Sequence, residues 1–172
     1  SALEYAQSGE ARKLMEAISK CDPRNLSSYL NEEDSGGFSA LHHAAAFDEV
    51  NNVVVLLSCP DFNFNKRNHR GASALHAASC SGSMRVIRKL LASEHSQEII
   101  DAQNEWGETA LHLAAGAQQT GSVQTLLEAG ADPKIKDRWG RCPFRVCVEN
   151  GGHSATLSAL TEAGISIDTD DI

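Results

Sequence analysis

The 172-residue chain has no run of eighteen apolar residues, and it does not begin with a basic segment followed by an apolar one. A transmembrane helix needs about 20 consecutive, mostly apolar residues, and a secretory signal needs both of those segments in that order. The sequence therefore predicts no membrane insertion and no secretory signal peptide.

Paired cysteines are also lacking. The five cysteines form no C-x-x-C motif and their number is odd: Cys21, Cys59, Cys80, Cys142 and Cys147. Disulfide-stabilised domains use even, paired sets, and zinc sites need several Cys or His residues at short spacing. We therefore expect a reducing, intracellular environment, cytoplasmic or nuclear, and neither a metal site nor a cofactor.

The sequence also lacks the common motifs of catalytic sites and an excess of basic residues. The chain contains no G-x-x-x-x-G-K-[ST], no G-x-S-x-G and no H-E-x-x-H, and its formal net charge is −8. These motifs supply phosphate binding, nucleophilic catalysis and zinc hydrolysis, whereas nucleic-acid binding needs a basic surface that neutralises phosphates. We expect no catalytic residue, no enzyme activity and no nucleic-acid partner.

What the chain does contain is a repeat, most complete in residues 105–137. Thr109 can cap a helix that begins with A-L-H-L-A-A, and Val123, Leu126 and Leu127 lie on one face of a second helix. Gly130 ends that helix, because glycine readily takes the positive φ found just past a helix end. Two short helices and an extended arm therefore make one unit.

Similar helix starts recur at Ser39, Ser73, Thr109 and Cys142. The differences 73 − 39, 109 − 73 and 142 − 109 are 34, 36 and 33 residues. The longest interval contains an inserted loop at residues 93–98. Self-similarity at a period of 20–50 residues is typical of solenoid proteins, in which each unit packs against its neighbours.

The segments T-A-L-H-L-A-A and L-L-E-A-G-A-D resemble the ankyrin repeat, whose signature is T-P-L-H-x-A with L-L-x-x-G-A-D downstream. The resemblance implies an all-α ankyrin-repeat solenoid of about five helix-turn-helix units with β-hairpin-like arms. We expect a single domain, 1–172, divided into an N-terminal cap at 1–31, units at 32–65, 66–101 and 102–134, and a C-terminal cap at 135–168.

The two caps depart from the repeat. Residues 1–31 predict two helices without the usual start, and Asp22 and Pro23 can begin a further helical turn. In the last helix we expect Ala155 and Leu160 to pack inward and Thr156 to face solvent. A polar outer face suits a terminal unit, which has a neighbour on one side only.

The histidines repeat with the units. His42, His76 and His112 stand at the fourth position of successive motifs. In the ankyrin family this histidine joins loop and helix by hydrogen bonds, and the resemblance implies the same structural role here. The fourth copy has Arg145 instead, which leaves its local hydrogen bonds undetermined.

The arms carry charges of alternating sign and two tryptophans. Acidic arms with Glu32–Asp34 and Glu105–Glu108 alternate with basic arms at 66–70 and 134–141. One interpretation is that neighbouring arms attract each other, and the other is that they hold a partner of mixed charge. Trp106 and Trp139 are either binding anchors, as tryptophans often are, or local hydrophobic covers over the neighbouring arm.

The resemblance implies a protein–protein interaction module, a scaffold or adaptor that binds a segment of another protein on its concave face. One alternative is a regulatory or inhibitory subunit that docks on an enzyme such as a kinase or phosphatase. The other is an enzyme, or a domain attached to an enzyme whose catalytic part lies outside this chain. We expect a monomeric domain, alone or within a longer chain. The predicted partner-binding residues are His43, Phe47, Arg67, His69, Arg70, Cys80, Trp106, Glu108, Leu113, Ala117, Gln118, Arg138, Trp139 and Arg141.

Overall fold

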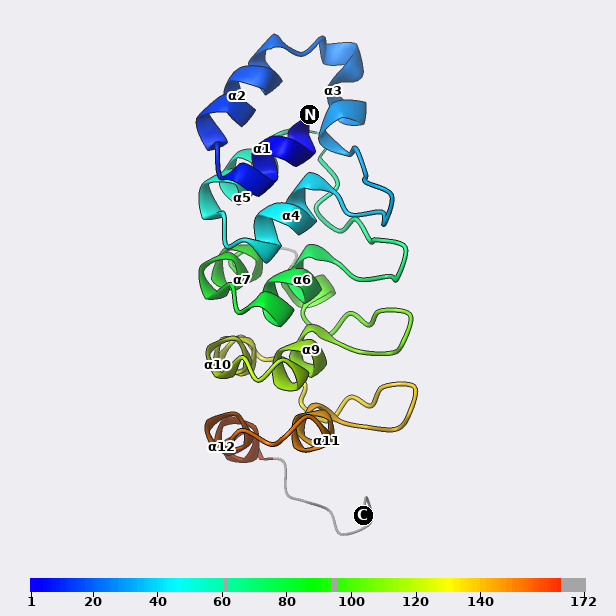
Figure 1. The fold of residues 1–172 in the computed structure, drawn as a ribbon, viewed down its shortest axis with the longest axis vertical. Helices are drawn as coiled ribbons and strands as arrows, with labels where there is room; N and C mark the ends of the chain where they lie inside the picture. Colours follow the sequence, from blue (N-terminus) through cyan, green and yellow to red (C-terminus); the bar gives the residue numbers. More distant parts are fainter. Residues whose placement is uncertain (61, 94–95, 165–172) are drawn as a thin grey trace.

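A computed structural model describes residues 1–60, 62–93 and 96–164, and in it pairs of helices stack into one elongated row (Figure 1). The helices are α1 Ala2–Ser8, α2 Ala11–Lys20, α3 Pro23–Leu30, α4 Ala40–Ala46, α5 Val50–Leu57, α6 Ala74–Ser81, α7 Met84–Leu91, α8 Ser96–Ile99, α9 Ala110–Gly116, α10 Thr120–Glu128, α11 Pro143–Glu149 and α12 Ser154–Glu162. The structure confirms the predicted all-α solenoid.

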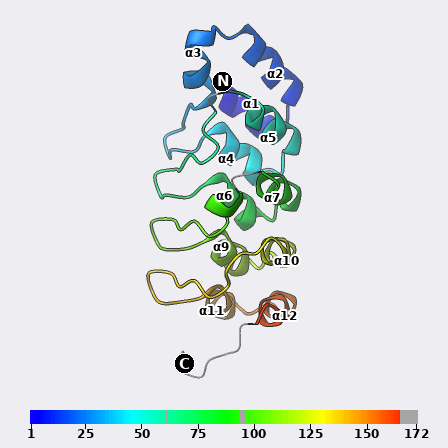
Figure 2. The same cartoon turned by 180° about the vertical axis from the view of Figure 1, so that it is seen from behind.

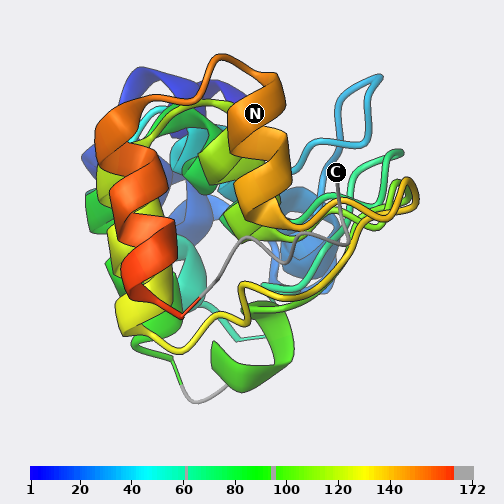
Figure 3. The same cartoon turned by 90° about the horizontal axis from the view of Figure 1, so that it is seen from below.

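The row has two layers of helices and one layer of arms. We call α1, α4, α6, α9 and α11 the inner helices, and α2, α5, α7, α10 and α12 the outer helices; each inner helix turns back into its outer partner. Seen along the stack, the arms project sideways from the inner helices (Figure 3), and from behind they form a parallel series (Figure 2). We call the side bordered by inner helices and arms the inner face.

Small residues let the inner helices pack closely. Ala44, Ala78 and Ala114 are fully buried at equivalent positions of α4, α6 and α9. The outer helices fill the space behind them with larger side chains, including Ile87 and Leu126. Burying a side chain of this size stabilises a fold by about 1.5–3 kcal/mol, and each unit buries its apolar side chains against its neighbours.

Two bends between inner and outer helices use a residue other than glycine at positive φ. Asp48 (φ 55°) accepts hydrogen bonds from Arg85 Nε (2.7 Å) and from the backbone N–H of Val86 (3.2 Å) in the next unit. Gln118 (φ 60°) accepts from the N–H of His153 (2.8 Å) and donates to another carbonyl in that unit. Bonds to the following unit thus offset the strain of the left-handed backbone.

Other local expectations need correction. The arms are turns, with one isolated antiparallel bridge between Glu33 and Ser39 and no strand within the described residues. The turn expected at Asp22 continues as the eight-residue helix α3, and the loop at 93–98 contains the start of α8. The acidic end of the chain, from 165 onward, lies outside the described residues.

The prediction for α12 was also wrong in its orientation. Thr156 is fully buried, because its hydroxyl pairs with that of Thr120 on α10 at 2.7 Å, while Ala155 is exposed. Leu160 is buried as expected. The hydroxyl pair between neighbouring units therefore decides which face of α12 points inward.

Replacing Ser79 by alanine is expected to raise the free energy of unfolding by about 1 kcal/mol. The Ser79 hydroxyl is buried in α6 without a hydrogen-bond partner, whereas Ala45 and Ala115 fill the equivalent positions in α4 and α9. The variant removes an unsatisfied polar group and improves helix propensity. Urea unfolding measures the change. Ser81→Ala, which removes a hydrogen-bonded hydroxyl, is the control and should bring no gain.

Candidate functional site

Each arm is a turn organised by one Asp or Asn side chain. Asp137 Oδ1 accepts hydrogen bonds from the backbone N–H groups of Trp139 and Arg141, both at 2.9 Å. Asn68 and Asn104 bind the corresponding N–H groups of their own arms, as does Asp34. Such side chains stabilise turns because they replace backbone acceptors. The arms therefore hold their tips in a fixed direction.

Consecutive arms are joined by one backbone hydrogen bond each, and we call this series the arm ladder. Its bonds run from His69 N–H to Gly36 O (3.0 Å), from Glu105 N–H to Arg70 O (3.1 Å) and from Arg138 N–H to Trp106 O (2.9 Å). The acceptors are the residues at the arm tips. The tip residues Gly36, Arg70, Trp106 and Trp139 therefore occupy equivalent positions in successive arms.

The repeated histidines form a second series of links between units. In each, the backbone N–H of the helix N-cap donates to Nδ1, so that Nε2 carries the proton. Nε2 then donates to a carbonyl of the next arm: His42 to Ala72 (2.9 Å), His76 to Glu108 (3.1 Å) and His112 to Arg141 (3.0 Å). We call these links the histidine ladder.

Burial keeps the histidine ladder neutral. It lowers the pKa of His76 from 6.5 to about 4, and it lowers the pKa of His42 and His112 in the same direction. The hydrogen bonds to carbonyls partly oppose this shift. A buried neutral imidazole with both nitrogens bonded is a structural group, in agreement with the role implied by the family resemblance.

The two tryptophans differ in exposure. Trp106 is half-buried and Arg70 lies over its ring, with Cζ 5.4 Å from the centroid. Trp139 is 61% exposed although Arg141 lies 4.8 Å from its ring centroid. The covering role suits Trp106, while the ring of Trp139 remains open to solvent.

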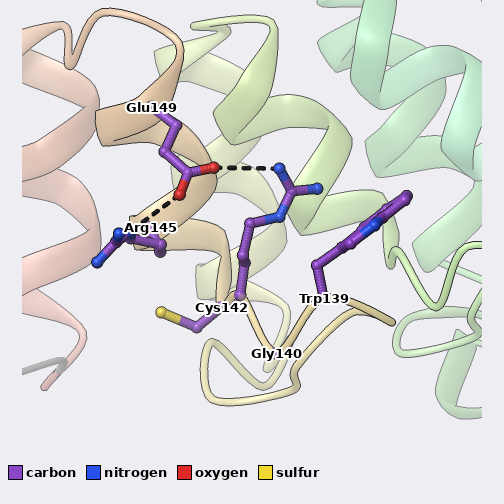
Figure 4. Close-up of a pocket in the computed structure, with 6 residues that line it drawn as sticks. Trp139, Gly140, Cys142, Arg145 and Glu149 are labelled. Atoms are coloured by element: carbon purple, nitrogen blue, oxygen red, sulfur yellow. Dashed lines mark hydrogen bonds and ion pairs between the residues drawn. The ribbon is translucent and has the colours of Figure 1, made fainter. Parts of the chain in front are cut away.

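A hollow of about 590 Å³ lies beside the last arm and α11. It is lined by Trp139, Gly140, Arg141, Cys142, Arg145 and Glu149 (Figure 4). Glu149 joins the two arginines across it, at 3.1 Å from Arg141 and 2.9 Å from Arg145, and both lower the pKa of its carboxyl group, Arg145 more strongly. The hollow therefore combines an aromatic ring with a fixed array of guanidinium groups and one carboxylate.

Several predicted partner-binding residues have intramolecular partners. His43 lies between Asp34 (3.0 Å) and Gln7 (3.1 Å), Arg67 binds carbonyls of its own arm and the next, and Glu108 accepts from Asn104. Arg141 binds Asp137 at 2.7 Å as well as Glu149. Binding by these residues stays a prediction, and the structure gives each of them a structural contact in addition.

The other predicted residues fall into two groups. Phe47 is 60% exposed at the end of α4, and His69, Arg70 and Arg138 are exposed at the arm tips. Cys80 is exposed on α6, while Leu113, Ala117 and Gln118 are partly buried in and after α9. Phe47, at the end of α4, and Trp139, in the arm before α11, lie in different units, with α6 and α9 between them.

Sequence reasoning did not select Cys142, Arg145 or Glu149 for the site, nor the role of Asp137. The carboxyl group of Asp137 is fully buried. Burial raises its pKa, but hydrogen bonds from Arg141 and two backbone N–H groups outweigh that effect and hold the pKa below its usual value. The sequence did contain one indication of this role. Asp137 lies four residues before Arg141, at the position where two other arms have Asn.

Charges of neighbouring arms pair at Lys66. Lys66 lies 3.0 Å from Glu33 of the preceding arm and also binds the carbonyl of Asn31.

Among the described residues, no three metal-binding side chains converge. Within the same part of the chain, no helix has both the length and the apolarity needed to span a membrane.

Comparison with known families gives a match along nearly the whole chain. A family model for ankyrin repeats (3 copies) matches residues 3–99, 41–137 and 95–171. The chain belongs to the ankyrin-repeat family. Within an ankyrin repeat, the histidine ladder is the product of the repeated T-P-L-H-like motif, and Arg145 marks the unit at which it ends.

Proteins of different kinds are similar to this ankyrin-repeat chain. It is 31% identical to NF-kappa-B inhibitor zeta of Mus musculus over 110 residues, 64% of the chain and 15% of that protein. It is 30% identical to transient receptor potential cation channel subfamily A member 1 of Homo sapiens over 149 residues, 87% and 13% respectively. The nuclear factor NF-kappa-B p105 subunit of Rattus norvegicus matches at 32% over 124 residues, 69% and 13%. The chain spans less than a sixth of each relative.

Proposed function

We propose that the chain is a protein-binding scaffold or adaptor domain that holds a segment of another protein between its arm tips and inner helices. Ankyrin repeats are a protein-interaction module, which supports this general role. The repeated arm turns support a binding surface of fixed shape, and a preorganised surface loses little conformational entropy on binding.

The exposed indole of Trp139 is the observation that carries the proposal. An aromatic ring that is 61% exposed contributes little to packing of the fold, and the nearby Arg141 keeps it upright by a cation–π contact. Tryptophan and arginine are the side chains most enriched at binding hot spots. A ring held in place in this way can bury its face against a partner at low entropic cost.

Trp139→Ala is expected to weaken binding of the partner about 30-fold, the equivalent of about 2 kcal/mol lost at a hot spot. Proteins captured from a cell lysate by the wild type are identified, and the affinity of each is then measured with purified components. Met15→Ala, at a side chain that is 52% exposed on the outer helix α2, is the matched control and should bind normally. Equal affinity for Trp139→Ala and wild type would refute the proposal.

A second candidate is a regulatory subunit that covers an enzyme or another regulated protein. One relative is named an NF-kappa-B inhibitor, and the arms of this chain form a long continuous row suited to a broad interface. Hydrogen exchange measured on the complex distinguishes a scaffold from an inhibitory subunit. A scaffold holding a short segment should protect a few neighbouring units, whereas an inhibitory subunit should protect arms along the whole row.

The proposal also covers the cellular location, the oligomeric state and the domain limits of the chain. We place the chain inside the cell, because its cysteines are odd in number and unpaired in spacing. We regard it as a monomeric, non-catalytic domain of five units with the boundaries given above, alone or within a longer protein. Size-exclusion chromatography with light scattering tests the monomer, and limited proteolysis tests the domain limits.

A further inference from the structure

The outer helices α2, α5 and α7 expose apolar side chains on the side of the molecule that faces away from the arms (Figure 1). Met15, Val54 and Met84 are exposed, one on each of these helices. They are half of the six large apolar residues that the described part of the chain exposes, and Met15 and Met84 are the two methionines of the chain. Single exposed apolar residues are common, but a group of them on neighbouring elements indicates an interaction surface.

Two of these apolar residues occupy a position that later units fill with polar side chains. The positive-φ residues of the first four bends are Gly9, Asp48, Gly82 and Gln118. The residues six positions further along are Met15, Val54, Arg88 and Gln124, and all four are exposed. The exposed position therefore carries apolar side chains in the first two units, without a need of the fold for them.

The same part of the outer face is basic, although the chain has a net charge of −8. Helices α2 and α7 contain three basic residues each and α5 contains none, and Glu16 is the single acidic residue of the three helices. The outer helices that follow, α10 and α12, contain no basic residue and one glutamate each. The basic part of the outer face therefore coincides with the exposed apolar side chains.

Three of the basic side chains are available to a partner. Arg12, Arg88 and Lys89 are exposed, and their side chains make no hydrogen bond or ion pair with the described part of the chain. Arg85 differs from them, because it binds Asp48 at 2.7 Å. The charges of Arg12, Arg88 and Lys89 are thus not neutralised within the fold.

Each available arginine lies beside an exposed methionine. Arg12 precedes Met15 by three residues on α2, and Arg88 follows Met84 by four residues on α7. Residues three or four apart are neighbours on the surface of a helix. Val54 lies between the two pairs, because α5 packs against both α2 and α7. The face therefore offers apolar contacts flanked by guanidinium groups, which bind carboxylates.

We propose that the outer face of α2, α5 and α7 is a second interaction surface, separate from the arm tips, which binds an acidic segment of a partner protein. Apolar side chains of the segment contact Met15, Val54 and Met84, and its carboxylates pair with Arg12 and Arg88. Methionine suits this role, because its flexible side chain adapts to the shape of a partner.

An anionic membrane surface fits this face less well. Three carboxylates, of Glu10, Glu16 and Asp48, pair with the other basic side chains, of Lys13, Lys20 and Arg85. A membrane would approach the face as a plane and meet these carboxylates, whereas a protein segment can contact the available arginines alone. The arrangement of charges therefore favours a protein partner.

Peptides that bind this face can be selected with the whole chain. A displayed library of random 12-residue peptides is selected against the wild type and counter-selected against Arg12→Glu/Arg88→Glu, which removes peptides bound elsewhere. The remaining peptides are expected to be rich in Asp and Glu and to contain apolar residues. The best peptide is labelled with a fluorophore, and its affinity, measured by fluorescence anisotropy, should fall as salt rises, because the recognised charges are exposed to solvent.

Single substitutions test the apolar and the charged contacts separately. Met15→Ala and Arg88→Ala should each weaken binding of this peptide about tenfold, as the loss of a hot-spot contact does. Gln124→Ala, at the equivalent position of α10, and Trp139→Ala, at an arm tip, should leave the affinity unchanged. All four side chains are exposed, and thermal unfolding verifies that each variant is folded.

Four results would overturn the inference. If no peptide remains after counter-selection, the face binds no acidic segment. If the peptide depends on Trp139 or Gln124 but not on Met15, it binds elsewhere. If the wild type binds phosphatidylserine vesicles and Arg12→Glu/Arg88→Glu does not, the face binds a membrane. If light scattering shows dimers that the same double variant abolishes, the face binds a second copy of the chain. None of these results affects the proposed function, which depends on Trp139.

Discussion

Asp137→Ala is expected to lower the free energy of unfolding by about 3 kcal/mol. The substitution removes an acceptor for the N–H groups of Trp139 and Arg141 and leaves the Arg141 guanidinium without its nearest carboxylate, at 2.7 Å. Removing one partner of a buried, hydrogen-bonded pair costs about 3–5 kcal/mol, and the partial exposure of Arg141 places this case at the low end. Urea unfolding followed by circular dichroism measures the loss.

Asp137→Asn is the matched variant, and it should cost far less. Asn68 and Asn104 make the same two backbone contacts in their arms, so an amide oxygen can organise the turn. The asparagine variant loses only the ion pair with Arg141. If asparagine and alanine prove equally destabilising at position 137, the ion pair and not the turn stabilises this arm.

Acidification from pH 7 to pH 4 should destabilise the fold through the histidine ladder. The pKa of His76 falls from 6.5 to about 4 on folding, so between these values the unfolded chain binds the proton and the folded chain does not. Stability is therefore complete above pH 6.5 and decreases as the pH falls towards 4. At about 1.4 kcal/mol per pKa unit, His76 alone accounts for about 3 kcal/mol.

His42 and His112 should add to this loss, because burial lowers their pKa as well. Urea midpoints between pH 7.5 and 4 measure it. The variant His76→Gln should be less stable at pH 7 and show a smaller dependence on pH, whereas His69→Gln, at an exposed histidine, should keep the wild-type dependence. A wild-type stability that is constant from pH 6.5 to 4.5 would contradict the neutral ladder.

The repeated features could be predicted from the sequence because each is local. The helix starts at Ser39, Ser73 and Thr109 and the role of their histidines follow from a pattern that recurs every 33–36 residues. The resemblance to ankyrin repeats supplied the all-α solenoid architecture, which periodicity alone does not specify. The fold and the starts of these inner helices were therefore predicted from the sequence.

Features that depend on one contact between units could not be predicted. The orientation of α12 follows from the hydroxyl pair of Thr120 and Thr156, two residues 36 positions apart with nothing in the local pattern to connect them. Glu149 was also missed, although its contacts with Arg145 and Arg141 lie within the last unit at separations of four and eight residues. Hydrophobic periodicity predicts which face is buried only when apolar groups decide that face.

The candidate site was predicted in part. Trp139 was selected as an unusual residue at an arm tip, and the structure adds that its ring is open while that of Trp106 is half-covered by Arg70. Both tryptophans precede a glycine in the same type of turn, so their local sequences do not separate them. The residue that lies over each ring differs: Arg70 of the preceding arm lies over Trp106, whereas Arg141 of its own arm lies over Trp139.

The two ladders also determine how the molecule responds to load along its axis. Every bond of the arm ladder and the histidine ladder joins a unit only to its immediate neighbour. A pulling force applied to the two ends of the molecule therefore acts in full on every interface between units. The first unit has a neighbour on one side only and is joined to the second by neither ladder, but by side-chain bonds such as that from Asn52 to the carbonyl of Tyr5, so extension should start at that end.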